Sequence, residues 1–278
     1  MQKIWFVTGA SRGFGALIVE HALKHGDQVV ATARNPQTVI DRFGAQEGLL
    51  ALPLDVNNEE QAHAAAKAAV EKFGRIDVLV NNAGFGLLGA VEEASSQEIE
   101  AVYRTNVFGL LAVTRAVLPH MRRQRSGRIF NFSSVGGYRS AAGFGVYAST
   151  KFAVEGLTEA LYEELGPLGI HVTAVEPGYF RTDFLDSTSL TVSPVQIDDY
   201  AATAGAVRER AKQISHAQPG DPDKLAEVLI AFADAVNPPV RLPLGSDTVA
   251  AIEAKHASDA ALLADWRTVA VSTDFDAK

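Results

Sequence analysis

Tyr147 and Lys151 are the residues whose types and spacing most directly indicate chemistry, in the segment YASTK at the start of an expected helix. Positions i and i+4 lie on one helix face, so the phenol and the ammonium can share a site. Free tyrosine has a pKa of about 10 and exchanges protons poorly at neutral pH. A neighbouring ammonium favours the phenolate and lowers that pKa, which predicts an acid–base group. Taken alone, the spacing is also common by chance on surface helices.

Other polar residues follow expected strands. Ser133 and Ser134 come directly after the run 128–132, at the carboxyl edge where ligands bind to parallel sheets. A hydroxyl there can hold a substrate oxygen. The segment 81–84 (NNAG) follows another strand, and Asn106 lies in the next helix. The alternatives are an ordinary turn at 81–84 and a solvent-facing position for Asn106.

A glycine-rich segment, TGASRGFG at 8–15, lies between the first strand and the first helix. Glycines let the backbone turn sharply and approach a pyrophosphate, and the N–H groups of the helix then hold the anion. The spacing is Gly-x-x-x-Gly-x-Gly, not Gly-x-Gly-x-x-Gly. In this context the segment predicts nucleotide binding, the alternative being a tight turn.

The end of the second strand indicates which nucleotide is bound. An NAD site needs a carboxylate here for the ribose 2′-hydroxyl, but this chain has Ala33 and then Arg34. Arg12 adds a second cation in the glycine-rich segment. Two guanidinium groups suit a 2′-phosphate, so we expect NADP(H). The alternative is two hydrated surface arginines.

These residues need a scaffold of alternating strands and helices. Apolar or β-branched runs predict strands at 4–7, 28–32, 49–54, 76–80, 128–132 and 170–175. Helical patterns occupy 13–25, 58–73, 96–118 (ending near Pro119) and 147–165. Strands separated by helices predict an α/β fold: one Rossmann-type, doubly wound parallel sheet with helices on both faces. No linker divides the chain, so we expect a single domain over 1–278.

The C-terminal third is less regular. Residues 179–222 are expected to form a substrate lid, with a helical piece at 198–214. In the C-terminal extension, 240–278, a short strand at 240–244 precedes a helix at 247–266.

Composition narrows the class of protein. The formal net charge is −8, from 25 Lys+Arg and 33 Asp+Glu, which argues against nucleic-acid binding. The chain has no cysteine, which excludes disulfides and thiolate metal sites. The N-terminal apolar run ends at Gly9, too short for a signal sequence or a membrane span. We therefore expect a cytoplasmic protein without membrane or nucleic-acid partners.

Over residues 3 to about 183 the chain resembles the short-chain dehydrogenases/reductases, in their shorter, non-extended and NADP-preferring form. The motifs fall in the family's order: 8–15, Asp55-Val56, Asn81–Gly84, Asn106, Ser134, Tyr147, Lys151, Pro177-Gly178 and Thr182. Ser134, not Ser133, matches the family serine by its interval to Tyr147.

The resemblance implies roles for these residues. The implied catalytic residues are Asn106, Ser134, Tyr147 and Lys151. Asp55 and Val56 would flank the adenine, and Thr182 would approach the carboxamide. Lys151 would bind the nicotinamide ribose, and Asn106 would hold a relay water. The expected cofactor contacts are Gly9, Ser11, Arg12, Gly13, Phe14, Gly15, Arg34, Asp55, Val56, Asn82, Ala83, Gly84, Tyr147, Lys151, Pro177, Gly178 and Thr182.

The implied reaction is NADPH-dependent reduction of a ketone or aldehyde, or oxidation of a secondary alcohol. Ser134 would hold the carbonyl oxygen and Tyr147 would protonate it. Two alternatives stay open: a non-catalytic NADP-binding sensor or scaffold, and an epimerase or dehydratase using the same Tyr–Lys pair.

Substrate size and assembly are less defined. Five aromatic residues in loops hint at a bulky apolar substrate, although core packing is an equal alternative: Phe85, Tyr138, Phe144, Phe180 and Phe184. The segment 242–245 (LPLG) replaces an Asp-Gly-Gly-rich strand of tetrameric relatives, which argues against the usual tetramer among possible homo-oligomers and leaves a dimer or monomer open. His21 and His25 have metal-ligand spacing but no third ligand, so we expect no metal.

Overall fold

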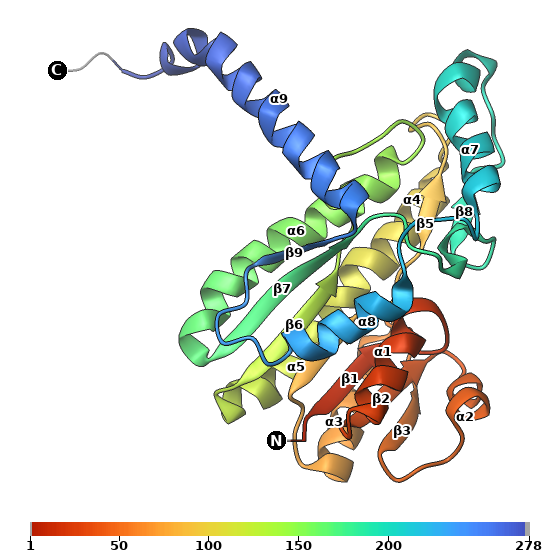
Figure 1. Ribbon diagram of the computed structural model, residues 1–278, viewed down its shortest axis with the longest axis vertical. Helices are drawn as coiled ribbons and strands as arrows, with labels where there is room; N and C mark the ends of the chain where they lie inside the picture. Colours follow the sequence, from red (N-terminus) through yellow and green to blue (C-terminus); the bar gives the residue numbers. More distant parts are fainter. Residues whose placement is uncertain (1, 276–278) are drawn as a thin grey trace.

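The computed structural model describes residues 2–275, and its centre is a sheet of seven parallel strands (Figure 1). The strands are β1 (Ile4–Thr8), β2 (Gln28–Ala33), β3 (Leu49–Pro53), β4 (Val78–Asn81), β6 (Gly127–Phe132), β7 (Ile170–Pro177) and β9 (Arg241–Leu244). Their order is β3-β2-β1-β4-β6-β7-β9. The chain reverses its direction of winding between β1 and β4, where such sheets leave a crevice for ligands. The predicted Rossmann-type fold in a single domain is confirmed.

Helices cover both faces of the sheet because its strands are apolar on both sides. Successive side chains of a strand point to opposite faces. In β1, Trp5 packs with α1 (Gly13–Lys24) and α8 (Pro222–Phe232), while Phe6 packs in the opposite layer. That layer is formed by α3 (Glu59–Phe73), α5 (Leu110–Gln124) and the end of α6 (Gly145–Leu165). Both residues are fully buried, so the sheet is a two-sided core.

Local signals set the ends of α3 as the sequence predicts. The Asn58 side chain accepts a hydrogen bond from the Gln61 N–H and so caps the first turn. Gly74, with φ of 85°, ends the helix in the left-handed conformation that glycine favours.

The helix predicted at 96–118 is wrong in two respects. The segment divides into α4 (Ser96–Tyr103), a π-helical piece (Arg104–Gly109) and α5. It also runs past Pro119 to Gln124. Proline has no N–H, so Pro119 leaves the backbone carbonyl of Arg115 without its helical donor. Arg115 is exposed, so water can bind this carbonyl. The buried side chain of Met121 holds the last turn of the helix in place. Single π-helical turns often mark functional sites, and this one contains Asn106.

Several elements have no counterpart in the sequence prediction. They are α2 (Gln37–Phe43), α8, and a small parallel sheet of β5 (Gly86–Leu88) and β8 (Leu190–Val192). The β5–β8 pair fastens the expected lid to the body of the protein. Within that lid, a 3-10 turn (Asp183–Leu185) precedes β8, and α7 (Ala206–Ile214) follows it.

The C-terminal strand and helix both form, as β9 and α9 (Ser246–Val271). β9 completes one edge of the sheet beside β7. α9 then leaves the body and projects away from it (Figure 1). None of the helices within residues 2–275 is long and apolar enough to cross a membrane.

Candidate active site

A cavity of about 480 Å³ lies at the carboxyl edge of the sheet, between the strand ends and residues of the 179–222 segment, which is expected to be a lid and is called the lid here. Ser134, Tyr147 and Lys151 line it together. Most of the expected cofactor contacts also line it: Gly9, Ser11, Arg12, Gly13, Phe14, Arg34, Asp55, Val56, Asn82, Ala83, Gly84, Pro177, Gly178 and Thr182. Two predicted residues, Gly15 and Asn106, are not part of the lining. The fold thus gathers residues far apart in the chain around one space of ligand size.

The glycine-rich segment is shaped to receive an anion. Gly9 and Gly13 have φ of 64° and 53°, which other residues rarely adopt. A Cβ on Gly15 would lie 2.3 Å from the Gly9 carbonyl oxygen, so only glycine fits beneath the turn. No side chain caps α1 at Arg12, which leaves the first N–H groups of the helix to bind a ligand. The segment therefore fits a dinucleotide pyrophosphate.

Asn82 fixes the position of this glycine-rich segment. Its Nδ2 donates to the carbonyl oxygens of Thr8 and Gly9, at 2.9 and 3.2 Å. The Thr8 hydroxyl in turn accepts hydrogen bonds from the N–H groups of Asn82 and Ala83, both at 3.0 Å. The ends of β1 and β4 are thereby locked together where the strand order reverses. Asn82 therefore shapes the cofactor cleft by keeping the glycine-rich segment in position.

Arg12 has a contact that the sequence did not reveal. Its guanidinium donates to the Thr188 carbonyl oxygen and, at 3.1 Å, to the Ser189 hydroxyl. It therefore links the glycine-rich segment to the lid. Arg34 lies exposed at the end of β2, and within the described residues it forms no ion pair.

Tyr147 and Lys151 meet at the start of α6, as the spacing predicts. Lys151 Nζ lies 5.7 Å from the centre of the Tyr147 ring and donates to the Phe132 carbonyl oxygen at 2.7 Å. Both side chains are buried, each with 7% exposure. Both neighbouring serines line the cavity, but the Ser133 Oγ lies next to Gly137, whereas the Ser134 hydroxyl is adjacent to Tyr147.

Burial dominates the protonation of this pair. It raises the pKa of Tyr147, and the adjacent Ser134 hydroxyl opposes the shift only in part. Burial lowers the pKa of Lys151 to about 8, with Glu155 acting in the opposite direction. The expected lowering of the Tyr147 pKa by Lys151 is thus wrong for the protein alone, because both groups have lost water and burial shifts each pKa towards the neutral form. With a pKa of about 8, Lys151 is still mainly charged at neutral pH.

Asn106 is a structural part of the site wall. Its amide accepts from the Phe85 N–H at 3.0 Å and donates to the Phe85 carbonyl oxygen at 2.9 Å. It also donates to the Thr150 hydroxyl at 3.2 Å. The side chain therefore connects the π-helical piece, the 84–85 segment and α6. Its expected role in holding a water stays a prediction.

The aromatic residues divide between the cavity and the core. Phe85, Phe144 and Phe184 line the cavity, and the Phe144 and Phe184 rings lie 6.1 and 5.6 Å from the Tyr147 ring. Phe180 reaches the lining but is buried against Phe14, with ring centres 5.5 Å apart.

Tyr138 is the exception, since for this residue the alternative of packing holds. It lies outside the lining and packs on His256 and Arg241, because α9 covers this part of the loop. Tyr179, which the sequence did not single out, lines the cavity instead.

Two buried or bonded carboxyl groups, those of Asp247 and Glu176, lie next to the residues that line the cavity. The Asp247 carboxylate accepts the Tyr179 N–H at 2.7 Å and fills the space where a Cβ of Gly178 would lie. Glu176, fully buried in β7, lies near Glu155 and 3.7 Å from Arg241 Nε. Burial, with Glu155 close by, raises the pKa of Glu176 to about 8. Sequence patterns carry no signal for either arrangement, since both join distant segments.

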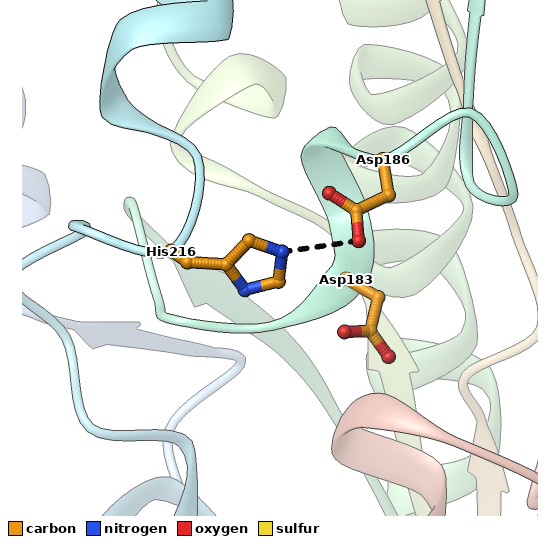
Figure 2. A group of neighbouring side chains, drawn as sticks. All are labelled: Asp183, Asp186 and His216. Carbon is orange, nitrogen blue, oxygen red and sulfur yellow. Dashed lines mark hydrogen bonds and ion pairs between the residues drawn. The ribbon is translucent and has the colours of Figure 1, made fainter.

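A cluster of possible metal ligands lies within the lid, formed by Asp183, Asp186 and His216 (Figure 2). His216 pairs with Asp186 at 3.1 Å and is exposed to water. The cluster connects the 3-10 turn of the lid to the end of α7. His21 and His25 are not joined in a site, because they pair separately with Asp223 and Asp27.

Comparison with known proteins agrees with this geometry. The family model "short chain dehydrogenase" matches residues 3–192. The chain is 40% identical to "Oxidoreductase BOA17" of Botryotinia fuckeliana, over 98% of this chain and 100% of the relative. It is 35% identical to a 3-ketodihydrosphingosine reductase of Bacteroides thetaiotaomicron, over 87% and 88% of the two chains. A crystal structure of a short-chain dehydrogenase from Streptomyces avermitilis matches with a TM-score of 0.91 and 39% identity, over 99% and 100%.

The chain therefore belongs to the short-chain dehydrogenase family. It is an oxidoreductase of the group that uses a nicotinamide cofactor and acts on small molecules.

Proposed function

We propose that the protein is an NADPH-dependent reductase of ketones or aldehydes, able to oxidise the corresponding secondary alcohols. The observation that carries this proposal is the meeting of Ser134, Tyr147 and Lys151 in the cavity that contains the glycine-rich segment. A hydroxyl, a phenol and an ammonium next to a dinucleotide cleft are the groups that carbonyl reduction requires.

Bound NADPH supplies the hydride that reduces the carbonyl carbon. The Ser134 hydroxyl donates a hydrogen bond to the carbonyl oxygen and orients it. Tyr147 then gives its proton to that oxygen, and its raised pKa keeps the proton available at neutral pH. The Lys151 ammonium stabilises the phenolate that forms. Asn106 holds the 84–85 segment against the same space, so the reacting groups stay in position.

The cofactor preference has its own support. β2 ends in Ala33 without a carboxylate, and Arg34 lies at the cavity. Among structural neighbours, ElxO, 27% identical with a TM-score of 0.73, has NADP bound. A 3-ketoacyl-(acyl-carrier-protein) reductase from Brucella melitensis with the same identity and TM-score is complexed with NADH. The neighbours therefore differ, and the charges of this chain favour NADPH.

Replacing Arg34 by Asp together with Arg12 by Ala should reverse this preference. Loss of charge-assisted hydrogen bonds to a 2′-phosphate should lower the ratio of kcat/KM for NADPH over NADH roughly 10- to 100-fold. Arg34→Asp alone separates phosphate binding from the contact of Arg12 with the lid. Arg139→Ala, which removes another cavity arginine, is the control. An unchanged ratio in the double variant would place the phosphate elsewhere.

The aromatic side chains around Tyr147 favour an apolar ketone. The Bacteroides relative is named for the reduction of a ketone, 3-ketodihydrosphingosine. We expect ketones with long or fused apolar groups to have lower KM values than small ones, since Phe85, Phe144 and Phe184 offer apolar contact. A panel of aldehydes, ketones, steroids and secondary alcohols, followed by NADPH absorbance, measures this.

The same panel decides among the competing functions. Turnover that consumes NADPH supports the reductase. Absence of turnover with retained NADPH binding would favour a sensor or scaffold. A cofactor that remains bound through purification and is not consumed would favour an epimerase or dehydratase.

A further inference from the structure

α9 is a long helix of which only the start is held by the body of the protein. Thr248 is fully buried in its first turn, and His256 contacts Tyr138 two turns later. From His256 to Phe275 every residue is exposed. Figure 1 shows this part of α9 standing clear of the other helices. We call residues 256–275 the arm.

The arm presents large apolar side chains to water. Leu262, Leu263, Trp266 and Val269 recur at helical spacing on one face, with exposures of 60%, 56%, 60% and 57%. An isolated helix is marginal in water, and helices in proteins gain most of their stability from packing an apolar face. Large apolar side chains gathered on one exposed face in this way indicate an interaction site.

We infer that the arm packs against a second copy of this chain and forms part of a dimer interface. A standard interface takes roughly 20–30 residues from each partner. The apolar face of the exposed run from His256 to Phe275 supplies a share of that number. In a two-fold dimer each copy supplies one arm, so both arms are buried by the same contact.

The charges of the arm favour this occupant over a lipid surface. Helices that lie on membranes carry Lys and Arg along their polar face. The arm carries Asp259, Asp265 and Asp274 against Arg267, so it is acidic. It therefore lacks the basic polar face that binds a lipid surface.

The arm also belongs to the fold of a relative. The Streptomyces avermitilis structure matches 99% of this chain, which includes α9, with a TM-score of 0.91. The match extends over α9, so this helix is an element of the shared fold. A second copy is the one partner present wherever the chain is made.

The test uses the full-length protein and light scattering coupled to size exclusion. Leu263→Glu with Trp266→Glu places two charges on the apolar face and should lower the molecular mass by a whole-number factor, with at least a tenfold weaker self-association. The control, Ala261→Glu with Thr268→Glu, adds the same charge on the opposite face and should leave the mass unchanged. A monomeric wild type, or equal masses for the wild type and the Leu263/Trp266 variant, overturns the inference.

A second measurement does not depend on a variant. Trp5 is fully buried and Trp266 is exposed in the single chain, so quenching by acrylamide reports on Trp266. The inference expects weak quenching at high protein concentration and stronger quenching on dilution. Strong quenching at all concentrations contradicts it. Binding to vesicles of neutral and anionic phospholipid by a monomeric protein would also overturn it, in favour of a lipid surface.

Discussion

Replacement of Tyr147 by Phe should lower kcat for ketone reduction by roughly 10²- to 10⁴-fold. The variant keeps the ring and its packing against Phe144 and Phe184 but loses the only proton that the phenol can give to the substrate oxygen. NADPH affinity should change little, because the glycine-rich segment is untouched. Steady-state turnover and a fluorescence titration with NADPH measure the two quantities separately.

Tyr138→Phe is the matched control for this variant. Tyr138 is also a tyrosine near the site, but its hydroxyl contacts His256 and it lies outside the cavity lining. Its kcat should stay close to that of the wild type. Because burial raises the pKa of Tyr147, reduction should persist into alkaline pH, whereas alcohol oxidation should accelerate as pH rises. Retained turnover in Tyr147→Phe would falsify the assignment of the acid.

Replacement of Lys151 by Met should have opposite effects on turnover and on stability. Turnover should fall by about 10²-fold or more, since the phenolate loses its neighbouring cation. The folded protein should become more stable at neutral pH, because burial lowers the pKa of Lys151 to about 8 from 10.5. At ~1.4 kcal/mol per pKa unit, that cost is about 3 kcal/mol.

The pH dependence of stability distinguishes the cost of burying the charged Lys151 from an effect of changed side-chain packing in the variant. Between pH 8 and 10.5 the unfolded chain binds more protons at Lys151 than the folded chain, so wild-type stability rises with pH in this window. The advantage of Lys151→Met should therefore be largest below pH 8 and shrink towards pH 10.5. Urea unfolding at several pH values measures it, with Lys255→Met on exposed α9 as the control. An advantage that does not vary with pH would show that Lys151 pays no burial cost.

Much of the scaffold could be predicted because its signals are local. Strands such as β1 are apolar runs, and the Asn58 and Gly74 caps of α3 can be read directly from the sequence. The spacing of Tyr147 and Lys151 places both on one helix face, and the structure places them together in the cavity.

What could not be predicted depends on contacts between distant segments. The start of α8 has a capping residue, Asp221, followed by Pro222, which is typical of a helix N-terminus. The apolar residues of the helix, however, make sense only once they pack against α1. The link between Arg12 and the lid joins residues more than 170 positions apart. The upward shift of the Tyr147 pKa follows from burial of the side chain, which the spacing of residues in the sequence does not reveal.

The buried carboxyl group of Glu176 makes the stability of the fold depend on pH, even when no ligand is bound. Its raised pKa means that the native chain holds this proton up to about pH 8, whereas the unfolded chain releases it near 4.5. Across that window, acidification adds stability and alkalinisation removes it. Melting temperatures recorded at different pH values will thus report proton uptake at the sheet as well as events in the catalytic cleft.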